Sequence, residues 1–137
     1  VWTSTNYASL ACADFPTCQG TYIPEMYFKN GFNLNQEVGP NYLYGLLDNP
    51  ARVAIHYSHR VSAILLTIIF LILMSKLWFS VAAPMASTLG ILLLTQITLG
   101  IINVVYVLPL YVAIGHNLVA ALLLLAVFSV NHLAWKK

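Results

Sequence analysis

Charged residues are scarce in this sequence. Only 7% of its 137 residues are Asp, Glu, Lys or Arg, whereas 60% are hydrophobic. A soluble domain carries roughly 25% charged residues, so this composition excludes an ordinary soluble protein and indicates an integral membrane protein. The net charge of +2 is too small to indicate nucleic acid, and the basic residues are not clustered with aromatics. We therefore expect membrane lipid and no nucleic acid as partners.

Cysteine is also scarce, because only Cys12 and Cys18 are present. Two cysteines without a further cysteine or histidine nearby make half a ligand set, which argues against a zinc site. Five residues separate them in a polar loop that contains Pro and Gly, a spacing that suits a small disulfide-closed loop on an oxidising face. Two free thiols are the alternative.

The sequence shows no initiator methionine and no signal peptide with a basic n-region and a small-residue cleavage site. It opens with Val1-Trp2, and no internal repeat or low-complexity tract is visible. We expect it to be a piece of a longer protein.

Residues 1–49 contain no stretch of about 20 consecutive apolar residues, so we expect no membrane span there. Aromatic residues recur among glycines and prolines, a mixture that suits the membrane–water interface. A short interfacial helix is predicted over Asn41 to Leu47. We interpret residues 1–49 as an extracytoplasmic loop region that carries the cysteine pair.

Residues 50–137 predict three transmembrane helices, at about 50–79, 84–107 and 109–135. Asp48-Asn49-Pro50 combines capping residues with a first-turn proline, which is typical of a helix start. A helix over 50–79 would be ~45 Å long at ~1.5 Å per residue, enough to cross a bilayer. The polar residues of the second helix, Gln96 and Asn103, are expected to face another helix.

The distribution of charge predicts the orientation. Lys76, Lys136 and Lys137 lie on one side of the predicted spans. The acidic residues up to Asp48 lie on the other, together with Lys29 and Arg52. The positive-inside rule places the lysines in the cytoplasm. The cysteine loop is then outside, where a disulfide is stable.

Two histidines occupy matched positions in the first and third spans, which run in the same direction. His59 is nine residues after Pro50 and His116 is seven after Pro109, so their depths differ by roughly 3 Å. Parallel helices can therefore present one imidazole to each face of a haem iron, for which imidazole is a common ligand. His132, near the other end of the third span, is expected to be interfacial.

Arg60 and His56 flank this predicted ligand. An ionisable residue near hydrocarbon is expensive, so Arg60 is expected either to extend outward to the interface or to pair with a haem propionate. His56 is one turn outward of His59 on the same helix face. It is an alternative ligand, a proton-handling group or an interfacial histidine.

Four motifs together resemble the haem A synthase family. The resemblance is to the C-terminal half of the proteins in that family, and it covers nearly the whole of this chain. The motifs are Asn6-Tyr7-Ala8-Ser9-Leu10-Ala11-Cys12-Ala13-Asp14-Phe15-Pro16-Thr17-Cys18-Gln19-Gly20, Ile55-His56-Tyr57-Ser58-His59-Arg60, Gln96-Ile97-Thr98-Leu99-Gly100 and Gly115-His116-Asn117-Leu118.

The resemblance implies a protein with eight membrane helices in two similar four-helix bundles. This chain would hold three helices of the second, haem-binding bundle, where haem b iron would be bound by His59 and His116. The cysteine pair matches a loop disulfide of the family. The first bundle would bind the substrate and carry a catalytic Glu, and His56 stands where that Glu lies in the corresponding motif.

The implied reaction is oxidation of a methyl group of haem O to the formyl group of haem A, for cytochrome oxidase. The first bundle is missing, and residues 1–10 would be only the outer end of this bundle's own first helix. We therefore expect this fragment alone to be inactive, with catalytic residues unknown.

Expected partners are haem O through the missing N-terminal half, a haem O synthase and an electron donor, and a homo-oligomer is a further candidate. The expected location is the bacterial inner membrane, with the mitochondrial inner membrane as the second choice. The alternative functions are a di-histidine membrane cytochrome b that transfers electrons and an assembly subunit without haem.

Overall fold

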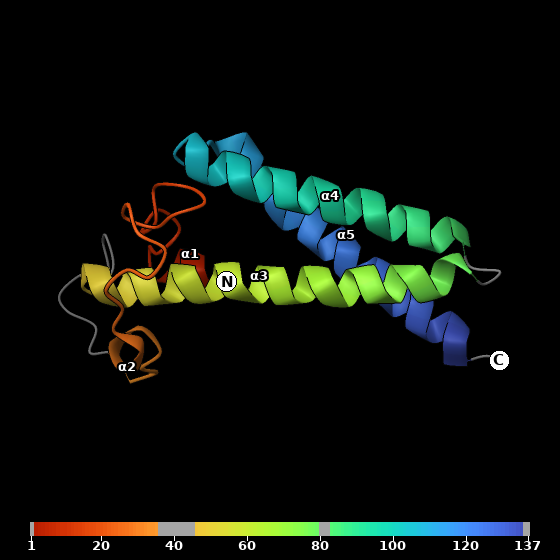
Figure 1. Ribbon diagram of the computed structural model, residues 1–137, viewed down its shortest axis with the longest axis horizontal. Coiled ribbons are helices and arrows are strands. Elements are labelled where there is room, and N and C mark those ends of the chain that lie inside the picture. The colour runs from red at the N-terminus through yellow and green to blue at the C-terminus, as the bar shows by residue number, and fades with distance from the viewer. Residues whose placement is uncertain (1, 36–45, 80–82, 136–137) are drawn as a thin grey trace. The chain divides into compact units, whose positions relative to one another are not determined.

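The computed structural model describes residues 2–35, 46–79 and 83–135, and over these ranges the protein is all-helical (Figure 1). Within them the only β-type pairing is an isolated bridge between Cys18 and Thr21. The helices are α1 (Trp2–Thr5), α2 (Phe28–Gly31), α3 (Asn49–Trp78), α4 (Ala83–Val105) and α5 (Leu110–Trp135).

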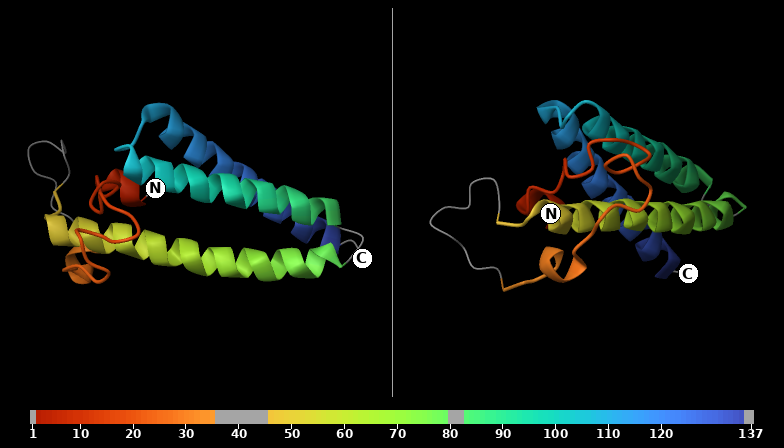
Figure 2. Two further views of the ribbon diagram at one scale, coloured as in Figure 1. Left: turned by 45° about the horizontal axis from the view of Figure 1, so that its top comes forward. Right: turned by 60° about the vertical axis from the view of Figure 1, so that its left-hand side comes forward.

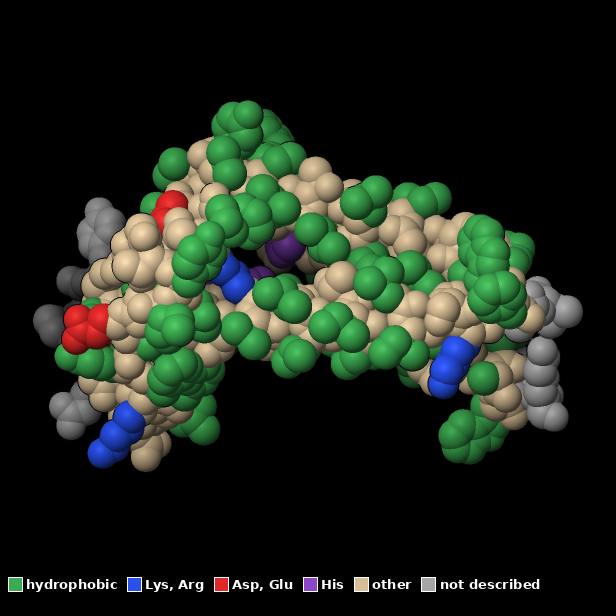
Figure 3. All heavy atoms as spheres, viewed as in Figure 1, with side chains coloured by type: hydrophobic (Ala, Val, Ile, Leu, Met, Phe, Trp, Pro, Cys, Tyr) green, Lys and Arg blue, Asp and Glu red, His purple; other side chains and the backbone are tan. Residues whose placement is uncertain are grey.

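The helices α3, α4 and α5 are each long and apolar enough to cross a membrane. Their limits differ from the predicted ones by at most two residues. Hydrophobic side chains are spread along the visible surfaces of α3 and α4, as a lipid-facing surface requires (Figure 3). The predicted class, an all-α integral membrane protein, is confirmed. Most of the interfacial helix predicted over Asn41 to Leu47 lies outside the described residues. Lys136 and Lys137 also lie outside them.

The start of α3 follows the predicted capping pattern. The Asp48 carboxylate accepts a hydrogen bond from the Ala51 N–H at 3.2 Å, which satisfies a backbone donor that the helix itself leaves open. The Asp48 carbonyl oxygen accepts the first helical bond, from Arg52 at 3.1 Å. Pro50 lies in this first turn, where its missing N–H costs nothing.

The chain forms two compact parts, and α3 contributes to both. The first part comprises the residues up to Ala63 together with Val104–Leu108. In this part Cys12, Cys18 and Val53 form a small core that joins the cysteine loop to the first turns of α3. The second part comprises Ile64–Asn103 and the residues from Pro109 onward.

The second part is built on an α4–α5 hairpin, in which α5 runs back antiparallel to α4 (Figure 2). Leu89 and Leu93 of α4 form its core with Leu123 and Val130 of α5. Side chains from the C-terminal half of α3, including Met74, pack against this core. The hairpin therefore brings together side chains of α4 and α5 that are far apart in the sequence.

Candidate functional site

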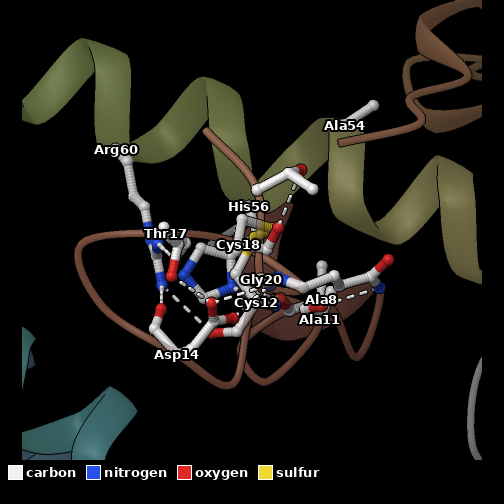
Figure 4. The surroundings of a disulfide bond; sticks show 12 residues. Ala8, Ala11, Cys12, Asp14, Thr17, Cys18, Gly20, Ala54, His56 and Arg60 are labelled. Carbon is white, nitrogen blue, oxygen red and sulfur yellow. Dashed lines mark hydrogen bonds between the residues drawn. A yellow bond between two sulfur atoms is a disulfide. The ribbon is translucent and has the colours of Figure 1, made fainter. Parts of the chain in front are cut away.

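His56 and Arg60 carry the first part's polar site. They are four residues apart on α3, so they lie on one helix face, and both point into the loop closed by Cys12 and Cys18 (Figure 4). The disulfide joins Cα atoms 4.6 Å apart, and both cysteines are buried. The first turns of a membrane-length helix thus contact the cysteine loop directly.

The His56 ring is buried, with only 4% of its surface exposed. Its Nδ1 lies 2.9 Å from the Ala8 carbonyl oxygen, and the Cys12 N–H donates to the same Nδ1 at 3.4 Å. One ring nitrogen cannot donate and accept at once, so the two contacts belong to different protonation forms of Nδ1. In either form His56 ties the segment before the disulfide to α3.

Arg60 binds the loop through its backbone. Its Nη1 donates to the Thr17 carbonyl at 2.7 Å, and its Nη2 donates to the carbonyls of Cys12 at 3.0 Å and Asp14 at 2.7 Å. The guanidinium also lies 5.6 Å from the centre of the Phe15 ring, a cation–π contact. Sequence reasoning missed these acceptors, because a backbone carbonyl leaves no residue signature.

Asp14 organises the other side of the loop. Its carboxylate accepts hydrogen bonds from the Thr17 hydroxyl, from the Gly20 N–H at 3.0 Å and from the Gln19 N–H at 2.6 Å. These donors, Thr17 above all, stabilise the charged form and lower the pKa of Asp14 from 3.8 to about 2. The loop therefore keeps a carboxylate at every pH at which the protein would function.

His116 lies in the second part, on α5, and faces α4. Its Nε2 is 3.1 Å from Nε2 of the Gln96 amide. One helical turn beyond Gln96, Gly100 leaves room for the ring, because a Cβ on Gly100 would lie 3.2 Å from His116 Cε1. Sequence reasoning assigned Gln96 to general helix packing; its four-residue spacing from Gly100 was the available signal for a shared face.

Buried polar atoms without a hydrogen-bond partner gather on this face. Among the described residues they include Gln96 Oε1, Asn103 Oδ1 and His116 Nδ1. Gln96, Gly100 and Asn103 follow one another at spacings of four and three, so they lie on one side of α4. A buried polar atom without a hydrogen-bond partner costs free energy, unless a bound ligand or water supplies that partner. The imidazole and its unpaired nitrogen are groups that can bind a haem iron.

The other two histidines differ from His56 and His116 in their surroundings. Both His59 and His132 are exposed in the structure. His59 belongs to the first part and His116 to the second, so the pairing of the two rests on their positions in their helices. Over residues 2–35, 46–79 and 83–135, no group of three or more His, Cys, Asp and Glu could hold a metal ion. A haem iron needs at most two protein ligands, so it requires no such group.

Comparison with known proteins assigns the chain to a family. The model of the cytochrome oxidase assembly protein family matches residues 1–128. The heme A synthase of Shewanella oneidensis is 41% identical over 137 residues, which cover 99% of this chain and 42% of that protein. The chain thus spans less than half the length of this relative. No solved structure matches. The family match covers most of the sequence, including both histidine motifs and the cysteine loop, and the chain therefore belongs to the cytochrome oxidase assembly protein family.

Proposed function

We propose that this chain is the haem-binding part of a haem A synthase, which oxidises a methyl group of haem O to a formyl group. The observation that carries the proposal is the 41% identity to a protein named heme A synthase, over 99% of the chain. We further propose that it lies in the bacterial inner membrane. Haem O would bind to the part of the protein that lies outside this chain, and a haem O synthase and an electron donor would be its partners.

The residues that we propose would hold haem b are His59 and His116. Their matched depths in α3 and α5 support the pair, and so does the open, buried nitrogen of His116 beside Gly100. When bound, haem supplies one-electron redox chemistry whose potential depends on the axial ligands and their hydrogen bonds. The protein's own contribution would be to present the two imidazoles to the iron, and that of His116 contacts Gln96 and lies against α4 at Gly100.

Arg60 is proposed to serve both the loop and the haem. Three of the guanidinium's five N–H donors bond to loop carbonyls. We propose that a propionate binds at the remaining donors, which would connect the cofactor edge to the cysteine loop. His56, buried between α3 and the loop, is proposed as an accessory group that handles protons rather than as an iron ligand.

The proposal is tested by titrating the purified chain, in detergent, with haem. We expect the absorption spectrum of six-coordinate, low-spin haem, and we expect His59→Ala or His116→Ala to remove it. His132→Ala is the matched control, because it removes an exposed histidine from α5 and should keep the spectrum. A low-spin spectrum that survives both His59→Ala and His116→Ala would contradict the assignment.

A second measurement separates the enzyme from a di-histidine cytochrome b that only transfers electrons. The same substitutions, placed in the full-length protein in cells, should abolish haem A formation, which is measured by extracting and separating the haems. Haem A levels that stay normal when the low-spin spectrum is lost would favour the electron-transfer alternative.

A further inference from the structure

Gln96 is in a position to control the chemistry of His116. The two side chains meet across α4 and α5 with 3.1 Å between their Nε2 atoms, and this is the hydrogen bond that His116 makes with a side chain of α4. Thr95 and Thr98, the neighbouring polar residues, instead bond to carbonyls of their own helix at 2.8 and 2.9 Å. The Gln96 amide is thus directed at the imidazole, whereas the hydroxyls of Thr95 and Thr98 form hydrogen bonds only within α4.

An amide can bind an imidazole in two ways. Its NH₂ group can donate to a bare Nε2, which leaves the ring proton on Nδ1, or its oxygen can accept a proton from Nε2, which leaves the lone pair on Nδ1. Each arrangement selects one neutral tautomer and prevents the ring from turning. The free ring has no such restriction, because the two tautomers of imidazole interconvert in water.

Gly100 adds a steric constraint to the same ring. A Cβ at this position would lie 3.2 Å from Cε1 and 3.7 Å from Nδ1 of His116, so the ring lies closely against the α4 backbone. The amide and the glycine therefore act on the ring from positions one helical turn apart.

We propose that Gln96 is a positioning residue that sets the tautomer and rotation of the His116 imidazole, and thereby its affinity for haem iron. The second half of this statement rests on the proposed function, whereas the first concerns the protein alone. Hydrogen bonds to the second nitrogen of a ligating histidine fix the ring and tune the metal, and their loss typically costs about 10–100-fold in metal affinity.

The first test needs no haem. In the purified chain, with ¹⁵N-labelled histidine, the ring nitrogens of His116 should show the shifts of a single tautomer. Gln96→Leu, which keeps the bulk and removes the amide, should move both shifts toward the average of two tautomers. Thr98→Val is the control and should leave them unchanged. Identical His116 shifts in Gln96→Leu and in the unsubstituted chain would overturn the proposal.

The glycine gives an independent variant. Gly100→Ala keeps the amide but presses on the ring, and we expect it to shift the same His116 signals. Gly90→Ala is the matched control on the same helix, because its Cβ would meet only the flexible Met74 side chain, at 3.5 Å. If neither Gly90→Ala nor Gly100→Ala shifts the His116 signals, the result would contradict close packing of the His116 ring against the α4 backbone.

The second test measures haem binding and the midpoint potential. Gln96→Leu should raise the haem dissociation constant about 10–100-fold and should also shift the midpoint potential of the haem that binds. Tighter haem binding in Gln96→Leu would overturn the proposal, because the amide would then compete with iron for Nε2. If the unsubstituted chain binds no haem, the proposed function fails, and the ¹⁵N measurement still decides whether Gln96 positions the ring.

Discussion

Single residues hold the cysteine loop on α3 through polar contacts that enclose it from both sides. Arg60 donates three hydrogen bonds to loop carbonyls from the helix, and Asp14 accepts three bonds from Thr17, Gln19 and Gly20 within the loop. Hydrogen bonds that involve a charged group are stronger than neutral ones. One cation and one anion thus order the loop in addition to its disulfide, with His56 as a third, buried contact.

The pKa of Asp14 gives a testable pH dependence. Because its folded pKa is about 2, below the ordinary 3.8, the stability that Asp14 contributes is fully present above pH 3.8 and is lost as the pH falls through about 2. The side-chain carboxyl ¹³C signal of Asp14 should therefore titrate with a midpoint near 2, and the loop amides of Gln19 and Gly20 should move with it.

Two variants control this measurement. Asp14→Asn should remove the transition and loosen the loop at neutral pH. Glu25→Gln changes another carboxylate of the same region, one that accepts from the Tyr27 hydroxyl, and should leave the Asp14 midpoint in place. A titration midpoint of the Asp14 carboxyl near the ordinary Asp pKa would show that the three hydrogen bonds to this carboxylate do not form in solution.

At the scale of elements, α2 and α3 approach each other at one glycine. The Tyr27 N–H donates to the Pro50 carbonyl at 3.1 Å, and the Gly31 carbonyl accepts from Trp2 Nε1 at 3.0 Å. Gly31 is buried, and a Cβ there would lie 2.7 Å from the Ala51 carbonyl oxygen. This contact lies against Ala51 and Ile55, two of the buried residues in the first turns of α3.

Gly31→Ala should therefore separate α2 from α3. The clash is with backbone, which cannot move aside cheaply, so we expect a destabilisation of about 1–3 kcal/mol and faster proteolysis of the segment around α2. Thermal unfolding followed by near-ultraviolet circular dichroism, together with limited proteolysis, measures both. Asn30→Ala changes an exposed neighbour in the same short helix and should leave both unchanged. Equal behaviour of the two variants would contradict the close packing.

Over the whole molecule, sequence reasoning succeeded where one strong physical signal acted along the chain. Long apolar runs predicted α3, α4 and α5, and the Asp48 cap predicted where α3 begins. The contacts of Arg60 with loop carbonyls and of Gln96 with His116 were not predicted. Both join segments far apart in the sequence, and their partners are backbone oxygens or a residue type that also serves ordinary helix packing.

The orientation of the whole chain in the membrane is the remaining prediction from charge. Lys76 lies in the last turn of α3, about 40 Å along the helix from Asp48 at ~1.5 Å per residue. A span of this length separates the two aqueous sides, so the positive-inside rule puts Lys76 in the cytoplasm and the cysteine loop outside.

Single added cysteines test this orientation without reducing the disulfide. Leu34→Cys replaces a side chain that is 82% exposed in the loop region, and Ser75→Cys places a thiol beside Lys76. A membrane-impermeant maleimide should label Leu34→Cys in intact cells and Ser75→Cys only after lysis. The unsubstituted chain is the control and should stay unlabelled, because Cys12 and Cys18 are bonded to each other. The opposite labelling pattern would reverse the orientation and would place the disulfide loop on the reducing side, where such a bond does not persist.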